Sequence, residues 1–226
     1  WPTIAEYGRN PANAAYINAI NLFAPEDPYI MYSLIPSLGK RRWLEANGKE
    51  YINSGFIFTQ RKLRYEFRYR KRQNLNLSSH GVDYASSPRR LHGLLWGASF
   101  FVGSSYWGIS QALNTWYDTT IRITDSASYL KLNTTEYNFG ISDWNGCSDP
   151  DFLFAGNRAG SPVYMAYMDV EFWQFFDHND AMVRYFIPCK HIVEGVEKSG
   201  FLDLVEAKWY GNANSSGSFT ISDSPS

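Results

Sequence analysis

Residues 61–73, "RKLRYEFRYRKRQ", alternate between apolar and charged side chains at almost every step. One set of alternate positions holds Leu63, Tyr65, Phe67 and Tyr69, and the other holds Arg64, Glu66, Arg68, Arg70 and Arg72. Because successive side chains of a β-strand point to opposite faces of a sheet, the pattern predicts a half-buried strand with a basic outer face. The chain is therefore expected to build a sheet that is packed on one side.

Strand-like segments also fill the rest of the chain after residue 40, separated by turns rich in glycine, serine and asparagine. They cover 91–110, where two short strands are expected, and then 116–124, 129–140, 150–158, 163–176, 182–190, 200–212 and 217–222. None of these segments has the 3.6-residue period of a long amphipathic helix. The sequence therefore predicts an all-β fold, a two-sheet antiparallel sandwich of the jelly-roll type.

The first 39 residues differ from this pattern, because they contain several prolines and no alternation. Within them, 10–23 predicts a short helix with Asn10 as its cap and Pro11 at its first position. We therefore divide the chain into an N-terminal arm (1–39), a jelly-roll body (40–221) and a disordered tail (222–226). The arm is equally compatible with docking on a neighbouring subunit and with folding over its own sandwich.

Composition excludes some classes of partner. The formal net charge of −1 provides no overall field for nucleic acid or membrane, and no apolar run approaches the roughly 20 residues that cross a bilayer. The chain begins at Trp1, so its N-terminus leaves secretion undecided. Cys147 and Cys189 form no C-x-x-C pair, and we expect two buried free thiols, with a single disulfide as the alternative.

Several motifs, taken in order, have counterparts in one known family. The segment 51–55, "YINSG", resembles the "YI-[DN]-[ST]-G" opening of the concanavalin-A-like (laminin-G-like) jelly rolls found in bacteriophage structural proteins and related bacterial surface proteins. The stretches 94–110 and 150–190 resemble the central strands of that family. Its closing block is matched by Arg184, Phe186, Ile187, Pro188 and Cys189, followed by Asp203, Leu204, Tyr210, Asn212, Gly217 and Phe219. The resemblance covers residues 40 to about 221 and fails at the arm and at the basic strand.

This resemblance implies a fold more firmly than an activity, since the family is functionally mixed. The expected function is that of a non-enzymatic virion structural protein, such as a capsid decoration, head-fibre or tail subunit. Its partners would be other virion subunits, including further copies of itself, and a host glycan. One alternative is a carbohydrate-binding module of a secreted or cell-surface protein. Another is a degenerate laminarinase-like glycosidase.

The stretch 167–180, "YMDVEFWQFFDHND", carries two acids in an aromatic run. Laminarinase-type relatives place Glu-x-Asp-x-Glu or Glu-x-Asp-x-x-Glu on one strand, and either register of this chain lacks one outer carboxylate. Since retaining chemistry needs two positioned carboxyl groups, we predict no catalytic residue. On a regular strand, Tyr167, Asp169, Glu171 and Trp173 would share a face and could form a glycan platform. The alternative is that the stretch is only a core strand. Val170, Trp173 and Phe175 would then be its packing residues, and the strand would need a bulge to place them on one face.

The basic strand offers a second candidate surface. Arg64, Arg68, Arg70 and Arg72 form a cationic stripe beside tyrosines, a composition that suits an acidic ligand or a subunit contact. The near-zero net charge, the interrupting Glu66 and the absence of a recognition motif argue against nucleic acid. We therefore treat the four arginines as partner-contact candidates, with protection of an exposed strand edge as the structural alternative.

The loop "SDWNGCSDPD" (142–151) is the one candidate for a metal site. Asp143, Asn145, Asp149 and Asp151 could offer oxygen ligands to calcium, although the spacing is not that of an EF-hand. An ordinary polar loop with Asx turns explains the same residues. No other cofactor is expected, because the four histidines lie in separate segments and no nucleotide-binding motif occurs.

Overall fold

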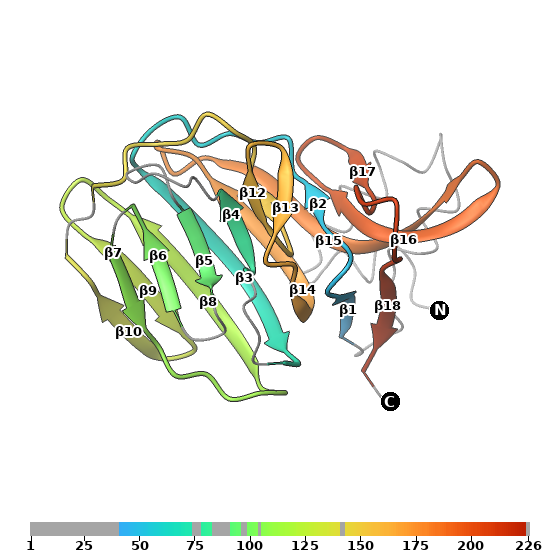
Figure 1. Cartoon of the computed structure of the whole chain (residues 1–226), viewed down its shortest axis with the longest axis horizontal. Coiled ribbons are helices and arrows are strands. Elements are labelled where there is room, and N and C mark those ends of the chain that lie inside the picture. The colour runs from blue at the N-terminus through green and yellow to red at the C-terminus, as the bar shows by residue number, and fades with distance from the viewer. Residues whose placement is uncertain are drawn as a thin grey trace, which may run out of the picture.

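The computed structural model describes residues 41–73, 78–82, 91–95, 99–103, 105–140 and 143–224. Within these ranges the chain forms β-strands and no helix. The strands make two sheets that stack face to face as a sandwich, and one long hairpin extends beyond the sandwich (Figure 1). The expected all-β, antiparallel sandwich is therefore confirmed.

The larger sheet contains the alternating strand of the sequence. Its order is β10 (Thr135–Asn138), β9 (Ser128–Leu132), β8 (Trp116–Ile123), β3 (Leu63–Lys71), β14 (Tyr167–Phe176), β15 (Met182–Val193), β16 (Val196–Asp203) and β17 (Lys208–Tyr210). Strand β14 has two different neighbours on the side away from β3. The first half of β14 pairs with β1 (Arg42–Asn47), which also pairs with β18 (Thr220–Asp223), whereas the second half of β14 pairs with β15.

The smaller sheet covers one face of the larger one. Its order is β13 (Ser161–Val163), β12 (Gly156–Arg158), β4 (His80–Val82), β5 (Leu91–Leu95), β6 (Ser99–Val102) and β7 (Ser105–Gly108), with β11 (Phe152–Leu153) joining β2 (Ile52–Asn53) to β4. Pairing is antiparallel except between β12 and β4. Segment 91–110 thus forms three strands where two were expected, because a further turn separates β6 from β7.

The core is largely aromatic and lies between the sheets. The apolar side chains of β3 are buried as its alternation predicts, with Tyr65 and Phe67 fully inaccessible to solvent. Trp173 from β14 stacks on Phe67 with ring centroids 4.7 Å apart and meets Phe154 from the opposite layer edge-on at 5.9 Å. Such ring pairs add about 0.5–1.5 kcal/mol each beyond the burial of their area.

A bulge in β14 sets which side chains reach this core. The pairing of β14 with β3 shifts register between Val170 and Phe172. Before the bulge Met168 and Val170 face inward, and after it Trp173 and Phe175 do. The bulge that these packing residues required is therefore confirmed.

Three other sequence-based expectations can be compared with the structure. Both cysteines are buried free thiols: Cys147 belongs to the main core, and Cys189 to a smaller cluster with Ile187 and Leu202. The last strand extends to Asp223, inside the segment 222–226 that was expected to be a disordered tail, because β18 continues its pairing with β1. The arm at 1–39 and its short helix lie outside the described residues.

Candidate functional site

The outer face of the larger sheet brings together the basic stripe and the acid pair. Strand β3 lies between β8 and β14, and the arginines of β3 face acids on both neighbours. In the sheet register Arg70 lies opposite Asp169, and Arg68 lies opposite Asp118. Directly opposed charges of opposite sign stabilise a pair of strands. The two sequence features therefore form one charge-compensated surface.

Asp169 is the centre of this surface. Its side chain is fully buried, and one oxygen lies 2.6 Å from the guanidinium of Arg70 while the other lies 2.9 Å from that of Arg72. Burial raises the pKa of Asp169 above its ordinary value, and the two arginines oppose that rise. Both oxygens lie against guanidinium groups and the carboxylate is fully buried, so it is not exposed to a ligand.

Glu171 is held in the same manner but is nearer the surface. It contacts Arg68 at 3.1 Å and Arg41 at 3.8 Å, and its side chain is 13% exposed. Burial raises its pKa, again against the effect of the arginines. Arg68 also contacts the exposed Asp118 at 2.6 Å. The carboxylate of Glu171 therefore belongs to a continuous row of alternating charges across three strands.

The remaining arginines of the stripe are also paired. Arg64 contacts Asp180 at 2.7 Å and also Glu66, and its guanidinium lies 3.4 Å from the centre of the Phe176 ring. Arg72 additionally reaches Glu45 at 3.8 Å. The stripe was predicted as a cationic contact surface, but its charge is neutralised within the sheet. That interpretation is therefore not supported for an acidic partner.

Two tryptophans that the sequence analysis did not select lie on this face. Trp43 and Trp116 meet edge-on with centroids 5.6 Å apart. The guanidinium of Arg70 lies 5.2 Å from the first ring and 4.9 Å from the second. These contacts are cation–π interactions, so the tryptophans contribute to holding the arginines in place.

The predicted glycan platform is wrong as a set. Trp173 is completely buried in the core, on the opposite side of the sheet from Asp169 and Glu171. The cause is the bulge between Val170 and Phe172, which reverses the alternation within the strand. Tyr167 is half-buried at the start of β14, with its ring against Gly48, where the absence of a Cβ allows that close approach.

The calcium candidates are divided between surface and core. Asp143 and Asn145 are exposed, whereas Asp151 is fully buried and accepts a hydrogen bond of 2.7 Å from the hydroxyl of Tyr65. Burial raises the pKa of Asp151 to about 7. Within the described ranges no three His, Cys, Asp or Glu side chains are arranged to hold a metal ion. The four candidates therefore do not fit one calcium site.

The hairpin formed by β15 and β16 is a second candidate surface. The two strands pair along their length up to Val193 and Val196, which enclose a two-residue turn. Strand β14 pairs with β15 only as far as Phe186, and β17 pairs with β16 only from Phe201 onward. In the described chain, the outer half of the hairpin is thus a ribbon with two open edges (Figure 1).

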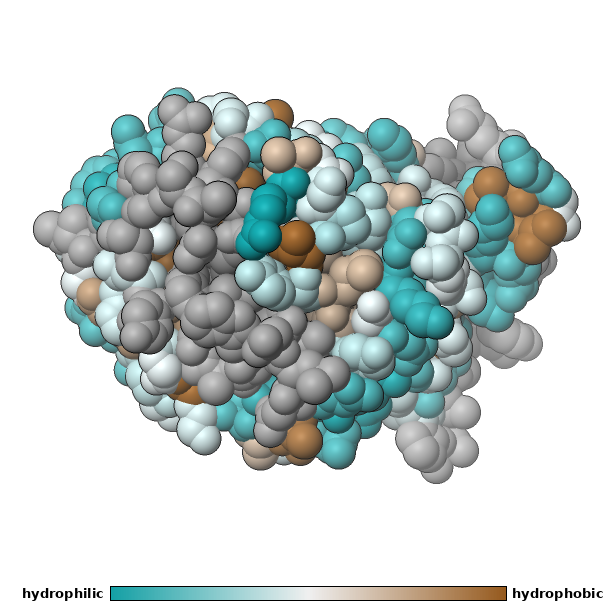
Figure 2. All heavy atoms as spheres, viewed as in Figure 1, coloured by the Kyte–Doolittle hydropathy of each residue, from teal (hydrophilic) through white to brown (hydrophobic). Residues whose placement is uncertain are grey.

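Apolar side chains gather at the tip of this ribbon. Ile192 is 39% exposed and Val196 is 58% exposed, beside a half-buried Val193. Figure 2 shows them as a hydrophobic patch at the outer end of the hairpin. Exposed apolar residues that cluster on a projecting element are typical of contact surfaces.

A groove of about 710 Å³ lies beside the outer half of the ribbon. One wall is the outer half of the hairpin, from Val193 to Ser199, and the other is the segment 209–219. The apolar lining comes from Val193, Val196, Trp209 and Phe219, and the polar lining is mostly uncharged. The two charged lining residues, Glu197 and Lys198, have opposite sign. The groove therefore favours an uncharged occupant.

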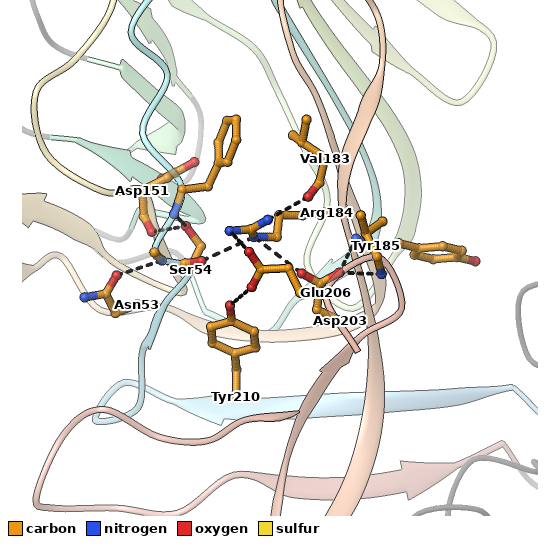
Figure 3. Close-up of polar contacts among 12 residues, drawn as sticks. Asn53, Ser54, Asp151, Val183, Arg184, Tyr185, Asp203, Glu206 and Tyr210 are labelled. Carbon is orange, nitrogen blue, oxygen red and sulfur yellow. Dashed lines mark hydrogen bonds and ion pairs between the residues drawn. The ribbon is translucent and has the colours of Figure 1, made fainter. Parts of the chain in front are cut away.

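The base of the hairpin is fixed to the sandwich by a polar network around Arg184 (Figure 3). Its guanidinium lies 3.4 Å from Asp203 on the partner strand and also contacts Glu206, which accepts a hydrogen bond from Tyr210. It further reaches the carbonyl of Ser54 at 3.5 Å. Asp203 is fully buried and accepts two backbone hydrogen bonds. This network sets the direction in which the ribbon leaves the sandwich.

The sequence analysis missed the outer half of this hairpin, because it ended one strand at Lys190 and began the next at Gly200. The available signal was Glu194–Gly195 between two apolar residues on one side and Val196 on the other. Both turn residues have positive φ, +53° and +77°, as a two-residue type I′ turn requires. An X-Gly pair flanked by β-branched residues predicts such a hairpin.

No protein-family model fits the sequence, and no curated protein is significantly similar to it. In the part of the chain that the structure describes, there is no helix that could span a membrane.

Proposed function

We propose that this chain is a non-enzymatic structural subunit that acts in the assembly of a virus particle. The observation that carries the proposal is the projecting hairpin with its exposed apolar tip, Ile192 and Val196. A two-stranded ribbon is at best marginally stable in water, and apolar residues at its tip add cost unless a partner covers them. Contact with a partner subunit explains both features.

The source of the particle is proposed from the motif resemblance. Under this proposal the two sheets form a concanavalin-A-like jelly roll of the kind found in bacteriophage structural proteins. The chain would then be a capsid decoration, head-fibre or tail subunit, located on the virion. Its partners would be other virion subunits and further copies of itself.

Particle association provides the direct test of this function. Antibody against the chain is expected to detect it in the particle fraction of the culture that naturally produces it, after sedimentation through a density gradient. A variant with both Ile192→Ser and Val196→Ser should shift to the soluble fraction, because the contact surface loses its apolar side chains. Wild-type chain found only in the soluble fraction would count against the proposal.

Lack of glycosidase activity is the second expected result. Asp169 is fully buried against Arg70 and Arg72, and Glu171 is 13% exposed and paired with Arg68 at 3.1 Å. The two are therefore not presented as the pair of accessible carboxyl groups that retaining chemistry needs. The purified chain should release no reducing sugar from β-glucans, and Glu171→Gln should behave identically. Sugar release by the wild type that disappears in Glu171→Gln would overturn the non-enzymatic assignment.

Glycan attachment is a second candidate function, and one observation favours it. Trp43 and Trp116 lie half-buried beside acids on the outer face of the larger sheet, where aromatic rings could stack on a sugar. Arg70 occupies the space over both rings, which reduces the area left for a ligand. A glycan array without any bound component would remove this candidate.

A further inference from the structure

We propose that the tip of the β15–β16 hairpin of one copy of this chain seats in the groove beside the hairpin of a second copy. The inference rests on the proposed assembly function and names the partner for the same surface. The tip presents the cross-strand pair Val193 and Val196 on the face that lines the groove, and Ile192 on the opposite face of the ribbon. The groove is the cavity of about 710 Å³ between the hairpin and the segment 209–219.

The chemistry of the tip matches the chemistry of the groove. The tip presents aliphatic side chains. Its charges balance, since the hairpin carries Lys190 and Lys198 against Glu194 and Glu197, and Lys190 forms a cross-strand ion pair of 2.7 Å with Glu197. The groove offers Trp209 and Phe219 among uncharged asparagine, serine and glycine residues. Neither surface carries a net charge that would select a strongly acidic or basic partner.

The position of the two surfaces favours an identical partner. Val193 and Val196 line the groove and also form the tip, so tip and groove adjoin on one molecule. A two-fold axis beside the hairpin would therefore place each tip against the groove of the other copy. Such an isologous contact uses the same patch on both subunits and buries it twice. Doubling helps a small surface reach the roughly 1,000 Å² of a specific interface.

The hairpin is also held in a fixed direction, which lowers the cost of ordering it on contact. Arg184 fixes its base, and the indole of Trp209 donates a hydrogen bond of 3.3 Å to the carbonyl of Cys189. Trp209 lies so close over Gly200 that a Cβ there would be 2.8 Å from its ring. A pre-organised element loses less conformational entropy when it binds.

The oligomeric state of the purified full-length chain tests the inference. Sedimentation equilibrium should show a dimer in the micromolar range, and Val196→Glu should weaken it at least about tenfold, because a charge enters an apolar contact. Val205→Glu is the matched control. Val205 is 47% exposed on the turn after β16 and does not line the groove, so this variant should dimerise like the wild type.

Cross-linking identifies which surfaces meet. One tagged chain carries Val196→Cys, and a second, differently tagged chain carries Ser215→Cys in the groove wall. Oxidation of the mixture should give a product with both tags, because the two thiols lie on different chains. A chain with Val205→Cys in place of Val196→Cys should give none. Both native cysteines are buried, which keeps their background low.

Three outcomes would overturn the inference. The wild type could remain a monomer at 100 μM, dimerise unaffected by Val196→Glu, or dimerise without the mixed disulfide. In the last two cases another surface, such as the N-terminal segment, forms the contact. If the chain is monomeric yet still lost from particles on Ile192→Ser and Val196→Ser substitution, the tip binds a different subunit. The assembly function would then stand without the second-copy contact.

Discussion

Replacement of Asp169 by asparagine is expected to lower the free energy of unfolding by about 3 kcal/mol. The carboxylate is fully buried and compensates two arginines, at 2.6 Å from Arg70 and 2.9 Å from Arg72. Asparagine keeps the size of the side chain but removes the carboxylate from Arg70 and leaves Arg72 with only the more distant Glu45, at 3.8 Å. Urea denaturation followed by tryptophan fluorescence measures the change.

Asp118→Asn is the control for this experiment. Asp118 also pairs with an arginine of β3, at 2.6 Å from Arg68, but its side chain is 59% exposed. Exposed ion pairs contribute about 0–1 kcal/mol, so this variant should stay within about 1 kcal/mol of the wild type. Equal losses in both variants would show that burial does not set the importance of Asp169.

A second large effect is expected from Asp151. Its pKa is raised from 3.8 to about 7 because the group is fully buried. The folded state therefore holds a proton that the unfolded state releases, so the contribution of Asp151 to stability is largest below pH 4 and is lost as pH rises to about 7. A shift of about three units corresponds to roughly 4 kcal/mol of lost stability over that window.

Asp151→Asn should remove this dependence, because an amide does not ionise. Unfolding free energies measured between pH 4 and pH 8 should fall by roughly 4 kcal/mol less in the variant than in the wild type. Tyr65→Phe should act in the opposite direction. The Tyr65 hydroxyl lowers the pKa of Asp151, so its loss should extend the decline to higher pH. Parallel profiles for wild type and Asp151→Asn would disprove the assignment.

The strand pattern of this chain is predictable because it depends on local alternation. β3 follows its sequence pattern residue by residue, and Trp173 and Phe175 could be sorted into the core once a bulge was allowed. The position of the bulge was not predictable, because it depends on how β14 pairs with β3. The predicted platform failed for this reason, since one shifted residue moves Trp173 to the other face.

The charge compensation on the outer face also required the fold. Arg70 and Asp169 are 99 positions apart, and their contact depends on which strands are neighbours and in which register. A basic stripe and an acid pair, considered separately, each suggest an external ligand. Once β3 and β14 are adjacent, each is the other's partner. Both features could be recognised in the sequence, but their contact in the folded sheet could not be predicted from it.

The core of the sandwich and the tip of the projecting hairpin are built from separate side chains. None of the side chains at 190–199 is fully buried, whereas the Arg184 network and the Ile187 cluster hold the base. A change of sequence at the tip would therefore alter the proposed contact without rebuilding the sandwich. For the same reason, an insertion at the Glu194–Gly195 turn is expected to leave the sandwich folded while blocking the proposed contact.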